Sequence, residues 1–190
     1  MSSGHRLGTL DFPNRAMTAR RAFAAGVAAL VVAASAQVAV PVPLSPVPMT
    51  LQPLAVLAVG GILGPLWGGA ALILYLALGL LGLPVFAGGG AGLVHVLGPT
   101  GGYLLAFPAA AAVAGRFAAP VPRLGPVLIG CALAMVVIHA GGAAQLAVLG
   151  GDPGLALRVG FMPFLTGDFL KIGIAAAVIL GLGPKLRTLL

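Results

Sequence analysis

Two oppositely charged residues interrupt the last apolar stretch of the chain, Phe161 to Leu182. The stretch is 22 residues long, enough to cross a hydrocarbon core of about 30 Å at about 1.5 Å per residue. It contains Asp168 and Lys171, and each ionisable residue inside a span costs about 2.5–3.5 kcal/mol. Their spacing of three residues places both on one helical face, where they can pair. The pair either fixes helix packing or forms a polar pocket for a ligand with groups of both signs, and we favour the pocket.

The composition is that of an integral membrane protein. Of the 190 residues, 60% are hydrophobic and 7% are charged, against about 25% charged residues in soluble domains. The net charge of +7 does not indicate nucleic-acid binding, because the basic residues flank apolar segments. A single cysteine, Cys131, excludes an internal disulfide. The histidines His5, His95 and His139 share no metal-ligand spacing, so we expect neither a metal nor a cofactor.

The apolar runs predict an all-α bundle of six transmembrane helices. Residues 1–18 read as a basic tail, and residues 19–190 as one membrane domain. Residues 51–83 are too long for one ordinary crossing and short for two, and Gly60, Gly61, Gly64 and Pro65 interrupt them. A cleaved signal peptide ending near Ala36 is the alternative for the first run. The expected spans are about 20–40, 51–63, 65–83, 100–118, 124–149 and 161–182.

The basic residues predict the orientation of the bundle. With six spans and a cytoplasmic N-terminus, eight of the ten Lys and Arg residues fall on the cytoplasmic side. Arg158 alone falls outside, and Lys171 lies within the membrane. This bias obeys the positive-inside rule, so we expect both termini to be cytoplasmic in a bacterial inner membrane. The connections 41–50, 84–99 and 150–160 then face outward.

The outer connections supply further residues for the expected pocket. Asp168 lies about 10 Å, and Lys171 about 15 Å, from the outer start of the last span. A suitable ligand has a carboxylate for Lys171, N–H groups for Asp168 and an apolar body. The other candidate ligand-binding residues are Thr50, Gln52, Phe86, Gly101 and Tyr103. Three of these have alternatives: Gln52 as a helix cap or a bridge between helices, Phe86 as core or lipid-facing, and Tyr103 as an interfacial anchor.

A stripe of small residues marks the first span, where Ala25, Ala29 and Ala33 recur every four residues. Such faces let helices approach closely in membranes, so the stripe is a candidate docking surface for another subunit or for another helix. The glycine run at 88–92 lacks the Lys-Ser/Thr of a phosphate loop. Because the chain also offers no grouping for nucleophilic catalysis, we expect a protein that is not an enzyme and does not use ATP itself.

Four motifs, in order along the chain, resemble the BioY family, the biotin-binding S components of energy-coupling factor (ECF) transporters. They are Val47-Pro48-Met49-Thr50-Leu51-Gln52, Gly82-Leu83-Pro84-Val85-Phe86-Ala87-Gly88-Gly89, Gly98-Pro99-Thr100-Gly101-Gly102-Tyr103, and Pro163-Phe164 through Gly167-Asp168 to Lys171. The resemblance covers positions 47–171. One departure is Gly90, close to where some relatives carry an arginine, which leaves a basic contact from that loop in doubt.

The resemblance implies a six-helix subunit that captures biotin from outside and works with a transmembrane coupling subunit and two ABC-type ATPases. It implies that Asp168 and Lys171 contact biotin, and that Ala25, Ala29 and Ala33 form the docking face for the coupling subunit. Biotin has a carboxylate, an apolar body and a ureido ring with N–H donors. The alternatives are an S component for another vitamin, or a structural or regulatory membrane subunit without a ligand.

Overall fold

The protein is a bundle of long helices closed at one end by short connecting elements. The computed structural model describes residues 15–118 and 121–190. Within them the long helices are α1 (Arg15–Ala36), α2 (Gln52–Leu80), α4 (Gly101–Ala118), α5 (Leu124–Gly150) and α7 (Leu165–Arg187). Of the expected tail, residues 15–18 form the first turn of α1, and residues 1–14 lie outside the described part of the chain.

The helix α2 consists of two helical segments joined at a sharp bend. Gly64 at the bend has φ 81° and ψ 176°, which is not helical, and Pro65 follows it. Pro65 has no N–H to continue the helical hydrogen bonds of the first segment. The two segments correspond to the expected second and third spans. With the bend counted, the described residues form six long helical segments, as the fold prediction requires.

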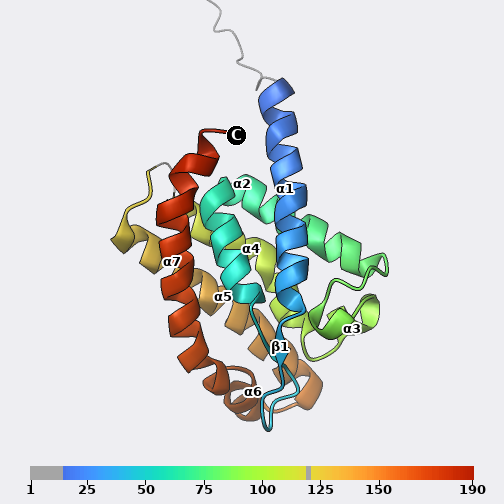
Figure 1. Ribbon diagram of the computed structural model, residues 1–190. Coiled ribbons are helices and arrows are strands. Elements are labelled where there is room, and N and C mark those ends of the chain that lie inside the picture. The colour runs from blue at the N-terminus through green and yellow to red at the C-terminus, as the bar shows by residue number, and fades with distance from the viewer. Residues whose placement is uncertain (1–14, 119–120) are drawn as a thin grey trace, which may run out of the picture.

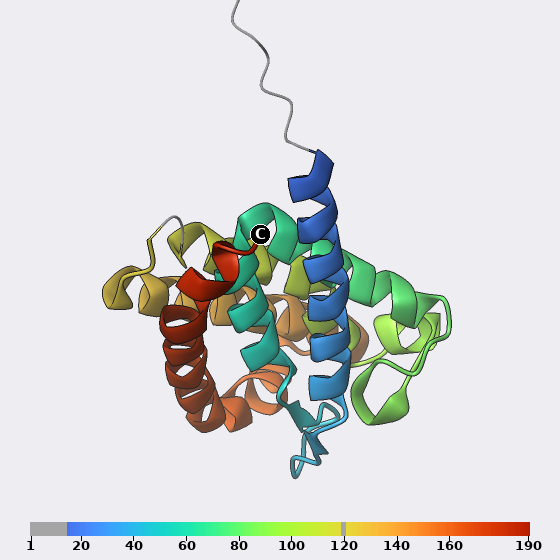
Figure 2. The same ribbon diagram turned by 45° about the horizontal axis from the view of Figure 1, so that its top comes forward.

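Within residues 15–118 and 121–190, four stretches are long and apolar enough to cross a membrane: Arg15–Ala36, Gln52–Leu80, Leu124–Gly150 and Pro153–Arg187. The shorter α4 lies inside the bundle, where it packs on α2 and α5. Figures 1 and 2 both show the first segment of α2 between α1 and α7. The core therefore forms around α2 and α4, with the other helices surrounding them.

The connecting elements gather at one end of the bundle (Figure 1). The proline-rich connection forms a hairpin of β1 (Ala39–Val40) and β2 (Met49–Thr50), with Ala39 opposite Thr50 and Val40 opposite Met49. We expected an extended connection there but no strand pairing. The glycine-rich connection contains the 3₁₀ turn η1 (Ala87–Gly89) and the helix α3 (Leu93–Leu97), neither of which we expected.

The amphipathic segment before the last span forms α6 (Pro153–Gly160), and the 3₁₀ turn η2 (Met162–Phe164) joins it to α7. Asp152 caps α6, because its Oδ1 accepts hydrogen bonds from the N–H groups of Gly154 at 2.8 Å and Leu155 at 3.0 Å. At the opposite end of the bundle, the start of α1 lies near the C-terminus: Arg21 Nε donates to the backbone oxygen of Leu190 at 3.3 Å. This agrees with the topology expected from the sequence, in which the N-terminus and the C-terminus lie on the same side of the membrane.

Candidate functional site

A small cavity lies at the end of the bundle where the connecting elements gather, between these elements and the long helices. Its volume, measured as the space open to the centre of a water-sized sphere, is about 50 Å³. One such sphere needs roughly 10–15 Å³, so the cavity holds a few water molecules as it stands. Its lining residues are Val47, Pro48, Thr50, Gln52, Pro53, Phe86, Ala87, Thr100, Tyr103, Leu104, Phe107, Ile138, His139, Phe164, Asp168 and Lys171.

The charged pair from the last span lies on the wall of this cavity. Asp168 is 4% exposed and Lys171 is 6% exposed, and both line the cavity. Lys171 Nζ donates to Asp168 Oδ1 at 3.3 Å. Both sit in the first two turns of α7, which η2 holds beneath the connecting elements. The pair is thus buried, mutually bonded and in contact with the cavity.

A third polar group, His139 of α5, completes the charged cluster. Its Nε2 lies 2.5 Å from Asp168 Oδ2. The imidazole is surrounded by aromatic rings, with centroids at 6.0 Å from Tyr103, 5.0 Å from Phe161 and 5.9 Å from Phe164. Among the described residues, His139 Nδ1 is the one buried side-chain nitrogen or oxygen without a hydrogen-bond partner.

From the sequence we weighed His139 only as a metal ligand, and its contact with Asp168 was missed. The signal was present, because an ionisable residue inside a span marks a functional site by default. His139 lies eleven residues before the end of α5 at Gly150, or about 16 Å along the helix. This is close to the depth expected for Lys171, so the two helices bring ionisable groups to the same level.

Gln52, which also lines the cavity, anchors a second polar network. Gln52 is 3% exposed, and its Nε2 donates to the hydroxyl oxygen of Tyr75 at 2.6 Å. That hydroxyl donates in turn to the backbone oxygen of Val85 at 3.1 Å, and Thr50 Oγ1 donates to Gln52 Oε1 at 3.2 Å. Gln52 therefore does bridge helical segments, as its alternative reading holds, and it also lines the cavity.

Phe86 closes the cavity on the side of the glycine-rich connection. It is 1% exposed, and its ring meets that of Tyr75 edge-on, with centroids 5.7 Å apart. Gln37 Nε2 donates to the backbone oxygen of Phe86 at 3.4 Å, which ties this connection to the end of α1. Neither bulk solvent nor lipid reaches the ring, so Phe86 is a core residue that also faces the cavity.

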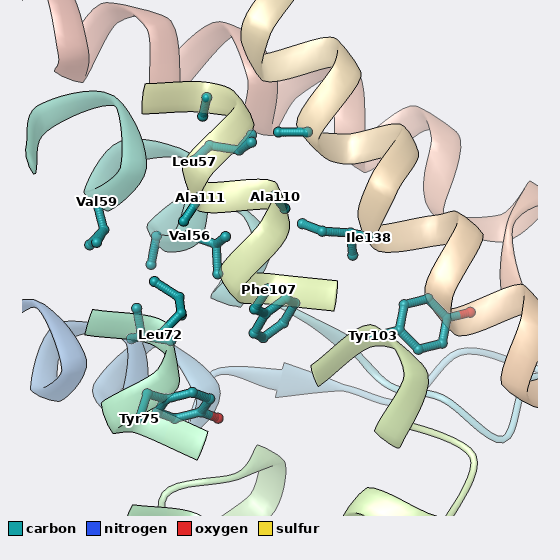
Figure 3. Packing of buried hydrophobic residues seen from close by; sticks show 14 of the residues in the cluster. Val56, Leu57, Val59, Leu72, Tyr75, Tyr103, Phe107, Ala110, Ala111 and Ile138 are labelled. Atoms are coloured by element: carbon teal, nitrogen blue, oxygen red, sulfur yellow. The ribbon is translucent and has the colours of Figure 1, made fainter. Parts of the chain in front are cut away.

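Tyr103 lies in the interior and not at the membrane interface. It is 8% exposed, and its hydroxyl donates to the backbone oxygen of Gly160 at 2.5 Å, joining α4 to the end of α6. Figure 3 shows Tyr75, Phe107 and Tyr103 along one edge of the core, from α2 and α4. Gly101 lies outside the cavity lining. A Cβ there would meet the backbone oxygen of Val96 at 1.7 Å, so glycine permits α3 to pack against the start of α4.

The small-residue stripe of α1 is covered by the protein itself. Ala25, Ala29 and Ala33 are 5%, 0% and 9% exposed, and α1 packs mainly on α2. The stripe therefore serves a helix contact within the chain, the second of the two uses left open above. An apolar groove of about 830 Å³ runs beside it between α1, α2 and α7, and Ala24, Ala28 and Val31 are among its lining residues.

The site offers both hydrogen-bond donors and hydrogen-bond acceptors in an apolar enclosure. Among residues 15–118 and 121–190, no group of three or more His, Cys, Asp or Glu side chains could hold a metal ion. Asp168 can accept hydrogen bonds, Lys171 can donate them, and Phe86, Phe107 and Tyr103 provide apolar surface. This combination can bind a small molecule with both donor and acceptor groups and an apolar body.

These features define a multi-pass α-helical membrane protein with an enclosed polar cavity near one end of the bundle. The pattern of conserved positions that describes the BioY family matches residues 11–188. The chain belongs to the BioY family.

Curated relatives agree with this assignment. The chain is 39% identical over 152 residues to "Probable biotin transporter BioY" of Pyrococcus horikoshii, covering 80% of this chain and 90% of that protein. It is 38% identical over 141 residues to "Biotin transporter BioY" of Thermotoga maritima, covering 74% and 83%. The fold is similar to the crystal structure of the S-component for biotin from an ECF-type ABC transporter, with a TM-score of 0.81 at 24% identity, covering 92% of this chain and 94% of that chain.

Proposed function

We propose that this protein is the biotin-capture subunit of an ECF-type vitamin transporter, and that it binds biotin in the cavity between Asp168, Lys171 and Phe86. The observation that carries the proposal is the buried Asp168–Lys171 pair on the wall of an enclosed cavity. Burying two charges costs several kcal/mol per ion, which their mutual attraction often fails to repay. A ligand that uses both charges gives the chain a reason to keep them there.

Biotin matches the chemistry of the lining. Its ureido N–H groups can donate to Asp168 or to Gln52 Oε1, and its carboxylate or ureido carbonyl can accept from Lys171. Its apolar body fits against Phe86 and Tyr103, which line the same cavity. The relatives' names, which are those of biotin transporters, support this choice of ligand. The remaining predicted residues, Thr50 and Gly101, would act by supporting Gln52 and the start of α4.

The cavity of about 50 Å³ is too small for a molecule the size of a vitamin. Binding therefore needs an opening between the β1–β2 hairpin and the glycine-rich connection, the two segments that contribute Val47, Pro48, Phe86 and Ala87 to the lining. We propose that these segments move apart to admit biotin and close over it afterwards.

Transport would depend on partners, a membrane coupling subunit and two ABC-type ATPases, because this chain has no nucleotide-binding motif. Since Ala25, Ala29 and Ala33 are covered by α2, we propose that the coupling subunit meets α1 on the adjacent groove, with Ala24, Val27 and Val31 among the residues it faces. Co-expression with the partners should raise cellular biotin uptake, and Ala24→Leu, at a partly exposed position of the groove, should reduce both co-purification and uptake while biotin binding stays unchanged.

The test is binding of labelled biotin to the purified protein. A hydrogen bond to a charged group contributes about 1.5–3 kcal/mol, so Asp168→Asn and Lys171→Ala should each weaken binding by roughly 10- to 150-fold. The controls are Asp152→Asn and Lys185→Ala, which remove the same charges at exposed positions. Competition with other vitamins tests the alternative ligands.

A structural role for the pair is the second candidate, and one observation favours it: Asp168 already has two partners, His139 and Lys171. A purely structural pair predicts that Asp168→Asn and Lys171→Ala lower the thermal stability, and that protein which still folds retains its affinity. Loss of affinity at unchanged stability would exclude that role.

A further inference from the structure

The two contacts of the Asp168 carboxylate differ in length. His139 Nε2 lies 2.5 Å from Oδ2, and Lys171 Nζ lies 3.3 Å from Oδ1. Charge-assisted N–H···O bonds are ordinarily about 2.7–2.9 Å long. The histidine contact is at the short end of the range for hydrogen bonds and the lysine contact is beyond the usual length. The carboxylate is therefore held mainly from α5, although Lys171 is its neighbour on α7.

Lys171 is correspondingly weakly engaged. An ammonium group has three N–H donors, and the one side-chain bond recorded for Lys171 in the described part of the chain is the long contact with Asp168. Its side chain lines the cavity and is 6% exposed. Donor capacity thus remains next to the cavity.

The imidazole is in a position to hold the carboxylate because its own position is fixed by packing. Tyr103 contacts it from α4, and Phe161 and Phe164 contact it from the segment before α7. The Asp168 side chain, in contrast, has a broad preference for its terminal torsion. Without a partner on α5, the carboxylate can turn until both oxygens face Lys171, which closes the pair on itself.

We propose that His139 is a positioning residue of the ligand site, which holds the Asp168 carboxylate toward α5 and so leaves the Lys171 ammonium and the remaining acceptor directions of Asp168 to the ligand. The ligand it serves carries both an N–H donor and an acceptor group. The inference rests on the proposed function. It adds His139, a residue that acts through Asp168 and that the Asp168–Lys171 ion pair does not need in order to form.

The contact also assigns the hydrogen on the imidazole. With the Asp168 carboxylate ionised beside Lys171, Nε2 must carry the hydrogen that bonds Oδ2. A neutral imidazole carries one N–H, so Nδ1, which has no hydrogen-bond partner among the described residues, is then the bare nitrogen. We expect the Nε2–H tautomer.

Two variants with the same functional group and different reach test the proposal. In His139→Gln the amide nitrogen takes the place of Nε2 and still donates to Asp168, whereas in His139→Asn it stops at the level of Nδ1. Biotin binding should stay within about threefold of wild type in His139→Gln and fall by at least about tenfold in His139→Asn. Equal affinities in wild type and His139→Asn would overturn the proposal, and so would equal losses in both variants at wild-type stability.

Nitrogen-15 NMR of the labelled wild-type protein in lipid keeps the proposal testable if a variant fails to fold. The His139 signals should show a hydrogen-bonded Nε2–H and an unprotonated Nδ1, and Asp168→Asn should shift Nε2. A hydrogen on Nδ1 with a bare Nε2 would refute the assignment. If wild-type protein binds no biotin, the proposed function fails, while the NMR result still decides whether His139 holds Asp168.

Discussion

At the scale of single residues, the absence of a side chain at Gly79 decides where Phe86 lies. A Cβ built at Gly79 would meet Cζ of the Phe86 ring at 2.1 Å, far inside van der Waals contact. The ring therefore lies directly over the backbone of α2, where it is 1% exposed and lines the cavity. Only glycine at this position allows so close an approach.

Gly79→Ala should accordingly weaken biotin binding. The added methyl group displaces the Phe86 ring, and overpacking of this kind costs about 1–3 kcal/mol. If the cost falls on the bound state, affinity drops by about fivefold or more, as measured by titration with labelled biotin. Gly173→Ala is the matched control, because a Cβ there has nothing within 4 Å. Equal affinities in the two variants would mean that the position of Phe86 does not matter for the ligand.

The sequence identified the site residues that are charged within an apolar span, because the free-energy cost of such charges does not depend on how the helices pack. Asp168 and Lys171 are charged in an apolar span and three residues apart, so their shared face follows from helical periodicity. His139 is 29 positions from Asp168, and its contact depends on how α5 packs on α7. Tyr75 escaped notice for the same reason, since its hydroxyl meets Gln52 and Val85 only after α2 bends.

At the scale of elements, the bend in α2 divides one apolar run into two helical segments that run in different directions through the bundle. Its Gly64 has φ 81° and ψ 176°, a combination that is essentially restricted to glycine. On α4, a Cβ at Gly115 would lie 2.5 Å from the carbonyl carbon of Gly64. The bend thus packs closely against α4 on one side.

We expect Gly64→Ala to destabilise the protein by about 1–3 kcal/mol, the usual cost of a residue forced into such a conformation. The measurement is thermal unfolding of the purified protein in detergent. Gly26→Ala serves as the control within a regular helix, since a Cβ at Gly26 meets nothing within 4 Å, and alanine favours a helix over glycine by about 1 kcal/mol. A Gly64→Ala protein as stable as wild type would contradict the strain assigned to this bend.

Glycine and proline revealed this break in the sequence because they act locally, through backbone geometry. The same local rules excluded a helix at the four prolines between 41 and 48, but they could not show that Ala39 pairs with Thr50. Pairing of so short a hairpin depends on the helices at its two ends. The helix α3 was likewise hidden, because five residues carry too little periodicity to distinguish a helix from a loop.

At the scale of the whole molecule, Arg187 joins the end of the chain to two other helices. From the sequence, Arg187 is predicted only to be a cytoplasmic charge. Its guanidinium donates to the backbone oxygens of Ile62 at 3.0 Å and Ala118 at 2.9 Å, and also to that of Gly61. These oxygens lie near the C-terminal ends of the first segment of α2 and of α4, where carbonyls lack helical partners and a positive charge is favourable. Arg187 thus belongs to the positive charges that predict the membrane orientation, and it also joins α7 to α2 and α4.

The sidedness of the membrane protein follows from its charges and can be tested directly. The connecting elements, including the β1–β2 hairpin, lie at one end of the bundle, and the C-terminal end of α7 lies at the other (Figure 1). Eight of ten basic residues belong to the second side by the expected topology. We therefore predict that the hairpin faces outward and that the C-terminus faces the cytoplasm.

The experiment labels single cysteines in intact cells with a membrane-impermeant maleimide. Cys131 is the one natural cysteine and is buried, so Cys131→Ala provides the background. Leu44 is 95% exposed, and Leu44→Cys should react in intact cells. Thr188→Cys, also at an exposed position, should react only after the membrane is opened. The reverse pattern would invert the topology and place the cavity on the cytoplasmic side, which is incompatible with capture of a vitamin from outside.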